Sequence, residues 1–160
     1  MSQSSGDGGA VRTTDSGATW TRAGDFHHPH GSSQIFQKPG AMYLGSQGNP
    51  SQNGVFKSTD LGVNWTRLAS GYGGNQGTGL VTGTTKLLYS TIGAGWGSVA
   101  APLDPGFMTA PFGSDTTWTK MTTPSGMVDG SKRIAVTNDG TYNILVAGNW
   151  HAGIWRYVEP

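Results

Sequence analysis

The chain has no cysteine among its 160 residues, and this absence removes several kinds of chemistry at once. A disulfide framework, a zinc site built from thiolates and a cysteine nucleophile are all excluded. Glutamate is scarce too, since it occurs only at Glu159, whereas Gly, Ser and Thr are abundant. Because good helix formers are few while turn and strand formers are many, the composition predicts an all-β protein with tight turns.

Charge and long apolar runs are also in short supply. Only 12% of the residues are charged and the formal net charge is +1, so we expect no nucleic-acid partner, which would require clustered positive charge. No window approaches the roughly 18 consecutive apolar residues of a membrane span, and no membrane partner is expected. The start MSQSSGDGG has no basic segment followed by an apolar run, so it is not typical of a signal peptide.

Aromatic residues are plentiful enough to build a core. The chain contains six tryptophans, and aromatic residues make up 10% of it, which is not typical of a disordered protein. Its length suits one domain with a buried interior. We expect a single domain over residues 1–160, with residues 1–8 as a flexible N-terminal segment.

One phrase occurs twice in the sequence. Residues 13–22 read TTDSGATWTR and residues 58–67 read STDLGVNWTR, which places Trp20 and Trp65 in equivalent positions. The match extends backward, because Arg12 and Lys57 end two similar segments that begin with glycine, and Arg156 ends a weaker copy near the end of the chain. A further copy runs from residue 106 to residue 120. Recurrence at this spacing predicts a repeating structural unit.

The segments between the copies predict strands. They come in pairs of short β-rich runs bounded by Gly, Pro and Asn, so each full unit contains four short antiparallel strands, which is the make-up of a β-propeller blade. About three blades fit into the chain. The predicted runs are Ser33–Gln37, Met42–Ser46, Gly79–Thr82, Leu87–Ile92, Arg133–Thr137 and Tyr142–Ala147.

The repeated phrase resembles the Asp-box, or BNR repeat, whose pattern is Ser or Thr, any residue, Asp, any residue, Gly, any two residues, Trp. The copy near residue 115 departs from the pattern, because only three residues lead from Asp115 to Trp118 where the pattern has five. The family includes sialidases, xyloglucan-active glycoside hydrolases, sortilin-type receptors and lectin-like secreted proteins, so the resemblance implies a propeller fold and an extracellular or periplasmic location. The matching residues are Thr13, Asp15, Gly17, Trp20, Ser58, Asp60, Gly62 and Trp65.

The residue types in the phrase predict a structural role. An Asp at a turn accepts backbone N–H bonds, a Gly supplies a positive φ, and a Trp buries a large ring beneath the hairpin. Catalysis or ion binding by Asp15 and Asp60 is the lesser alternative, since turn geometry already accounts for their spacing.

About three blades are fewer than the four that a closed propeller needs. Two explanations stay open. Either a second copy completes the ring, as in a homodimer, or the chain is part of a longer protein.

Candidate binding residues gather in one group of connections. If the Asp-box turn joins the third strand to the fourth, the connections from fourth to first strands and from second to third strands lie at the opposite end of the sheets. These connections contain all four histidines and several aromatic residues, a combination that suits a sugar ring and its hydroxyls. The predicted partner is therefore a carbohydrate, and the predicted ligand-binding residues are His27, His28, His30, Tyr72, Trp96, Trp150 and His151.

A metal site is a weaker hypothesis for the same region. His28 and His30 flank Pro29, so an extended backbone would point both rings to one side. However, the chain has no thiolate, and Asp25 is the carboxylate close to them in sequence. Hydrogen-bonding or packed histidines are the preferred interpretation, and we expect no metal and no other cofactor.

Enzymes are the alternative to a binding module. A sialidase would need an arginine cluster and a tyrosine nucleophile supported by glutamate, and with one Glu near the C-terminal end this activity is not expected of this chain alone. A glycoside hydrolase would need two facing carboxylates, for which Asp25, Asp104 and Asp129 are candidates.

A polysaccharide lyase would instead use a histidine base beside a uronic carboxylate, with His27, His28 or His30 acting together with Tyr72. We favour a glycan-binding module, because it needs aromatic platforms and hydrogen bonds but no tuned acid. A purely structural or protein-interaction propeller is a further alternative.

Overall fold

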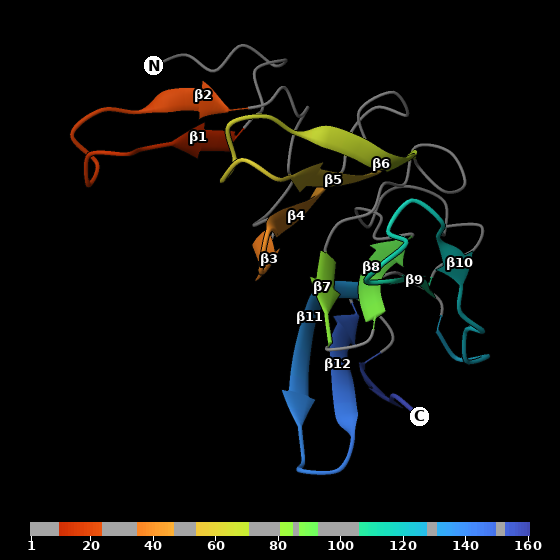
Figure 1. Cartoon of the computed structure of the whole chain (residues 1–160). Helices are drawn as coiled ribbons and strands as arrows, with labels where there is room; N and C mark the ends of the chain where they lie inside the picture. Colours follow the sequence, from red (N-terminus) through yellow and green to blue (C-terminus); the bar gives the residue numbers. More distant parts are fainter. Residues whose placement is uncertain are drawn as a thin grey trace, which may run out of the picture.

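The computed structural model describes residues 10–23, 35–46, 54–70, 81–84, 87–92, 106–127, 131–149 and 153–160. These ranges contain thirteen β-strands in four antiparallel sheets and no helix, which confirms the prediction of an all-β protein (Figure 1). Accordingly, no helix that could cross a bilayer is found in the described ranges.

The first four-stranded sheet follows the order of the chain, β3-β4-β5-β6. Its first two strands are joined by Pro39 and Gly40, and Gly40 has a φ of 79°. Proline at the second position and a positive-φ glycine at the third are the residues of a type II turn. The strands are β3 (Ile35–Lys38), β4 (Ala41–Ser46), β5 (Gly54–Ser58) and β6 (Thr66–Ser70).

The second four-stranded sheet repeats this arrangement, because its strands are also neighbours in chain order. The strands are β7 (Val81–Gly83), β8 (Leu87–Ile92), β9 (Gly106–Pro111) and β10 (Thr119–Lys120). Consecutive antiparallel strands joined by short connections keep each sheet local in sequence.

Two smaller sheets lie at the two ends of the described chain. At one end is a hairpin of β1 (Ala10–Arg12) and β2 (Thr21–Ala23), which Figure 1 shows in red, set apart from the other sheets. At the other end, β11 (Ser131–Asn138), β12 (Asn143–Asn149) and β13 (Ile154–Val158) form a three-stranded sheet in chain order.

Each of the six runs predicted from sequence overlaps one strand, namely β3, β4, β7, β8, β11 or β12. The boundaries differ most in the last pair, because β11 and β12 pair in register from Ser131–Asn149 to Asn138–Asn143 and are longer than the predicted runs. Residues 1–8, expected to be flexible, lie outside the described residues.

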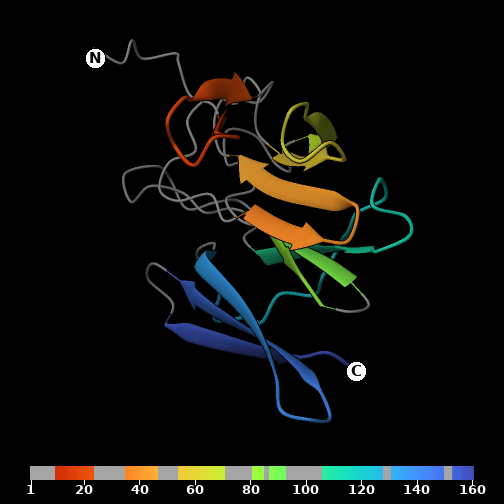
Figure 2. The same ribbon diagram turned by 60° about the vertical axis from the view of Figure 1, so that its left-hand side comes forward.

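The three larger sheets pack against one another in the order of the chain, as Figure 2 shows for the orange, green and blue strands. Side chains alternate between the two faces of a strand, so in the sheet of β7 to β10 one face meets the preceding sheet and the other meets the following one. Three clusters fill the spaces between sheets. They are centred on Leu44 and Phe56, on Tyr43 and Val55, and on Tyr89, Ile134 and Leu145.

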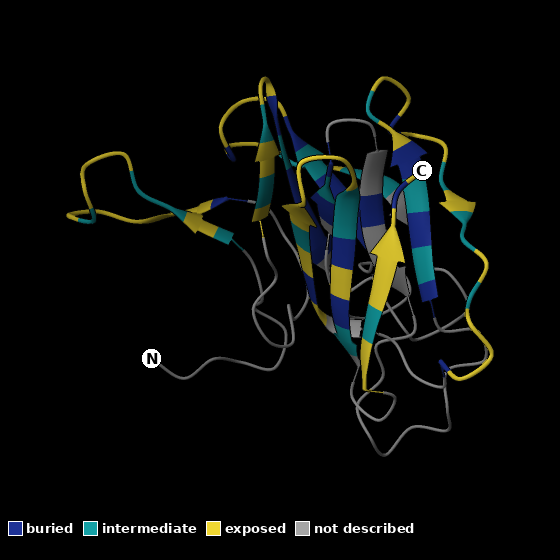
Figure 3. Cartoon of the chain, turned by 90° about the horizontal axis from the view of Figure 1, so that it is seen from below, coloured by how far each residue is buried: buried dark blue, intermediate teal, exposed yellow. Residues whose placement is uncertain are grey.

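Within the described residues the sheets do not close into a ring. Figure 3 shows the consequence for burial, since the central strands carry alternating buried residues while the strand leading to the C-terminus is mostly exposed. The established architecture is therefore a series of packed antiparallel sheets.

Candidate functional site

The residues predicted to bind a sugar lie outside the described residues. This applies to His27, His28, His30, Tyr72, Trp96, Trp150 and His151, and equally to the candidate catalytic carboxylates Asp25, Asp104 and Asp129. The repeated phrase, in contrast, is described completely.

The first loop, residues 13–20, joins β1 to β2 and is held together by its own side chains. The Asp15 carboxylate accepts hydrogen bonds from the backbone N–H and the hydroxyl of Thr19, at 2.8 Å and 2.5 Å, and from the Thr13 hydroxyl at 2.7 Å. The Thr13 oxygen in turn accepts the Gly17 N–H at 2.8 Å, and the Trp20 indole N–H donates to the Gly17 carbonyl at 3.1 Å.

The second loop, residues 58–65, joins β5 to β6 and repeats these contacts. Asp60 accepts bonds from the Asn64 N–H and side-chain amide at 2.9 Å and 2.7 Å, and from the Ser58 hydroxyl at 2.8 Å. The Ser58 oxygen accepts the Gly62 N–H at 2.8 Å, and the Trp65 indole donates to the Gly62 carbonyl at 3.1 Å.

Both loops also share one backbone conformation. Gly17 and Gly62 have φ values of 92° and 83°, and the residues before them, Ser16 and Leu61, also have positive φ. Two consecutive left-handed residues are costly unless the second is glycine, which explains why glycine stands at this position in both loops.

The hydrogen bonds inside the loops lower the pKa of the two carboxyl groups. Bonds from Thr19 and Thr13 lower the pKa of Asp15 to about 2, and bonds from Asn64 and Ser58 lower the pKa of Asp60 to about 2. Both carboxylates are thus ionised at neutral pH and already accept several local hydrogen bonds. Such contacts fix a turn, in agreement with the structural role expected of them.

The third loop, residues 111–118, joins β9 to β10 and keeps only part of this pattern. The Trp118 indole donates to a carbonyl three residues earlier, that of Asp115, at 2.9 Å, as Trp20 and Trp65 do in their loops. Asp115 therefore occupies the place of Gly17 and Gly62, and its carboxylate points away from the loop.

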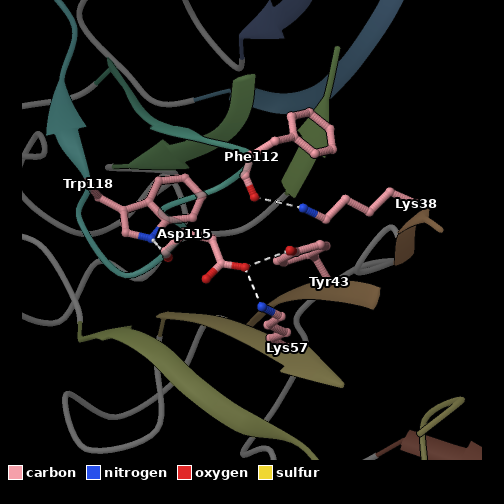
Figure 4. Close-up of polar contacts among 6 residues, drawn as sticks. All are labelled: Lys38, Tyr43, Lys57, Phe112, Asp115 and Trp118. Carbon is pink, nitrogen blue, oxygen red and sulfur yellow. Dashed lines mark hydrogen bonds and ion pairs between the residues drawn. The ribbon is translucent and has the colours of Figure 1, made fainter. Parts of the chain in front are cut away.

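The Asp115 carboxylate enters the contact between the two four-stranded sheets, as Figure 4 shows. It is 8% exposed, and its Oδ2 accepts the Tyr43 hydroxyl at 2.7 Å and the Lys57 Nζ at 2.6 Å. Tyr43 and Lys57 are opposed residues of β4 and β5, so the acid of one sheet is bound by two strands of the other. Lys38 adds a second link, since its Nζ donates to the Phe112 carbonyl at 2.9 Å and lies 4.2 Å from the Phe112 ring centroid.

The charges in this cluster, formed by Lys38, Tyr43, Lys57 and Asp115, compensate one another. Burial alone would raise the pKa of the Asp115 carboxyl, but the hydrogen bonds from Lys57 and Tyr43 outweigh it and hold the pKa below its usual value. Burial, together with the bond to Asp115, raises the pKa of the Tyr43 hydroxyl, and burial lowers the pKa of Lys38. The arrangement is a hydrogen-bonded ion pair between the buried Asp115 and the half-buried Lys57, and it ties two sheets together.

The next sheet contact contains a second tie of the same design. Glu159, directly after β13, is 3% exposed, and its Oε1 accepts the hydroxyls of Tyr89 and Thr84, both at 2.8 Å. Its Oε2 accepts the Asn143 side-chain amide at 2.5 Å. Tyr89 lies on β8 as Tyr43 lies on β4, so in both contacts a tyrosine of the second strand binds a carboxylate that follows the third strand of the next sheet.

Sequence reasoning missed both ties, although a signal was present. Tyr43 and Tyr89 are separated by nearly the same distance along the chain as Asp115 and Glu159, close to the spacing of the repeat. Neither the pair of Tyr43 and Asp115 nor the pair of Tyr89 and Glu159 resembles a known motif, because each joins residues more than 60 positions apart. In the described ranges no three His, Cys, Asp or Glu residues come together in a way that could hold a metal ion.

Comparison with known proteins adds little to this picture. No protein-family model matches the chain, and no curated protein is similar to it in sequence. It is similar to the crystal structure of a protein of unknown function from Dyadobacter fermentans DSM 18053, with 16% identity and a TM-score of 0.49. The similarity covers 92% of this chain but 46% of that protein, so the chain spans less than half the length of its structural neighbour.

Proposed function

We propose that the protein is a glycan-binding Asp-box propeller module of a carbohydrate-active protein. In this proposal the loops at residues 13–20 and 58–65 are Asp-boxes, the loop at residues 111–118 is a degenerate one, and the four sheets are complete or partial blades. The binding site is then formed by the connections at the sheet ends opposite to these loops.

The single observation that carries the proposal is the position of the three loops. In both four-stranded sheets the loop joins the third strand to the fourth, and the same contact from the indole N–H to a backbone carbonyl recurs in all three loops. In an antiparallel sheet in chain order, the connections that follow the second and fourth strands leave from the other end. Residues 24–34, 47–53, 71–80 and 93–105 are such connections, and residues 150–152 join β12 to β13.

All of the predicted ligand residues belong to these connections. Indole, phenol and imidazole groups provide flat faces for the C–H surface of a sugar and hydrogen-bond partners for its hydroxyls. The loops with the Asp-boxes are occupied by their own hydrogen bonds, so they offer few free acceptors to a ligand. We infer that binding and turn fixation are divided between the two ends of the sheets.

A glycan array followed by calorimetry with the best oligosaccharide tests this function. We expect binding that is weakened at least tenfold in the H28A/H30A and W96A variants, whereas Leu61→Ala, an exposed substitution in the second loop, leaves affinity unchanged. Incubation with the bound glycan separates a module from an enzyme, since new reducing ends would indicate a hydrolase and unsaturated products a lyase. An array without any bound glycan would reject the proposal in favour of a structural or protein-interaction role.

A further inference from the structure

We propose that the free edge of β13 pairs with strand β2 of a second copy of this chain, by reciprocal strand exchange. The inference rests on the proposed repeat but not on the proposed glycan site, so the strand exchange and the glycan binding are tested by different measurements. It deepens the expectation of a homo-oligomer by naming the strands that meet.

The first step is that strands with the same starting sequence occur in three of the sheets, each directly after a loop that ends in tryptophan. Strands β2, β6 and β10 all begin after a tryptophan with Thr followed by Arg or Lys. In each sheet this Trp-Thr strand pairs with the strand that precedes it in the chain, and its Thr lies opposite an equivalent residue of that preceding strand. The opposed pairs are Thr21 with Arg12, Thr66 with Lys57, and Thr119 with Thr109.

The second step is that the corresponding edge of β13 carries no paired strand among the described residues. Lys57 and Thr109 also lie opposite the tyrosines Tyr43 and Tyr89 of the neighbouring second strands. In the last sheet Arg156 lies opposite Val146. Arg156 follows Gly153 at the same spacing as Lys57 follows Gly54, which identifies it as the residue equivalent to Lys57. Among the described residues β13 pairs with β12 alone, and its Ile154 is 81% exposed. A five-residue strand without Pro or Lys is an edge that readily accepts another strand.

The third step identifies which strand is available. Trp65 packs against the cluster of Leu44 and Phe56, and Trp118 packs in the cluster of Tyr43 and Val55, so β6 and β10 are anchored. Trp20, which precedes β2, is 59% exposed. Strand β2 pairs with β1 at three register positions, and its last residue, Ala23, is buried. An isolated two-stranded hairpin is marginally stable in water.

Exchange would break the hydrogen bonds that close the loop at residues 13–20, and in return it would give β2 a longer partner. Strand β2 would leave β1, a three-residue strand that ends in Arg12. It would join β13, a five-residue strand that carries Arg156 at the same register position, and the sheet of β11 to β13 would become four-stranded. If each copy donates β2 to the other, the assembly closes as a symmetric dimer.

The absence of cysteine allows a direct test by cysteine pairing in the full chain. Opposed residues of antiparallel strands lie about 4.5–5.5 Å apart between Cα atoms, within the range that a disulfide spans. A mixture of the T21C and R156C single variants should form a disulfide-linked dimer under mild oxidation. A mixture of T21C with T137C, an exposed position on β11, is the matched control and should stay monomeric on a non-reducing gel.

A second variant tests the proposal even if the single-cysteine variants misfold. In R12C/T21C the two cysteines are opposed within one chain and lock β2 onto β1, so light scattering should show loss of the dimer, which returns after reduction. The proposal is overturned if the unmodified chain is a monomer, if the locked variant still dimerises, or if R156C links mainly to itself, which would indicate pairing of two β13 strands.

Discussion

The three loops share the hydrogen bond from the tryptophan indole to a backbone carbonyl, but the acid of the third loop has a different role from the acids of the first two. In residues 13–20 and 58–65 the acid stands five positions before the tryptophan, is exposed, and binds groups of its own loop. In residues 111–118 the acid stands three positions before the tryptophan, is buried, and binds another sheet. Two positions along a turn thus decide whether a carboxylate fixes its own hairpin or joins two sheets.

The largest expected effect is the loss of the acid in the third loop. Asp115→Ala leaves the half-buried Lys57 and the buried Tyr43 hydroxyl without their acceptor. Breaking this partly buried pair should cost about 3 kcal/mol, the lower end of the range for buried pairs. The free energy of unfolding from urea titration should fall by that amount. The free energy of unfolding should fall less in Asp115→Asn. The double variant D115L/K57M, which removes both charges, should recover most of the loss. Equal losses in all three variants would contradict an electrostatic tie.

The two tryptophans of the matching loops offer the next contrast. Trp65→Ala removes a ring packed on Leu44 and Phe56 and should cost about 2–3 kcal/mol, somewhat below the range for fully buried aromatic residues. Trp20→Ala removes a mostly exposed ring and should cost well under half as much. Thermal unfolding of both variants, side by side, measures the ratio, and equal effects would show that Trp20 is covered in solution.

The two ties are compared by removing one hydroxyl from each. Tyr43→Phe leaves the Asp115 oxygen with Lys57, whereas Tyr89→Phe leaves the Glu159 oxygen with Thr84, a neutral donor. We expect both to lose about 1–2 kcal/mol in urea unfolding, with Tyr89→Phe the larger, because the charged donor Lys57 stays bound to Asp115 when the Tyr43 hydroxyl is removed. The reverse order would show that Lys57 does not compensate for the lost hydroxyl.

The smallest effect concerns the exposed acids of the loops and appears in their titration. The pKa of Asp60 is lowered from 3.8 to about 2, so its stabilising contribution is complete above pH 3.8 and disappears as the pH falls toward 2. Carboxyl chemical shifts followed by NMR should show this midpoint. Asn64→Ala removes the side-chain donor but keeps the backbone N–H, so it should move the midpoint part of the way back toward 3.8. Asp15 in the same sample is the internal control, because its partner Thr19 is unchanged.

The glycine of the matching loops explains why they were recognisable in the sequence. A turn that needs a left-handed residue and an acid that accepts the following N–H groups admits few residue types, and all of them lie within eight positions. The same locality made the strands predictable, since alternation and turn residues are properties of short segments. The sugar-binding prediction also came from local composition and stays a prediction.

The sequence by itself determined the all-β class, the strand runs, the repeat and the turn chemistry of the first two loops, because each depends on contacts within a few residues. Only the tertiary structure decided that Asp115 pairs with Tyr43 and Lys57, that Glu159 binds Tyr89, and that β13 has an unoccupied edge among the described residues. These features arise where sheets far apart in sequence meet, and the identity of the opposing residue is set by packing rather than by neighbours along the chain.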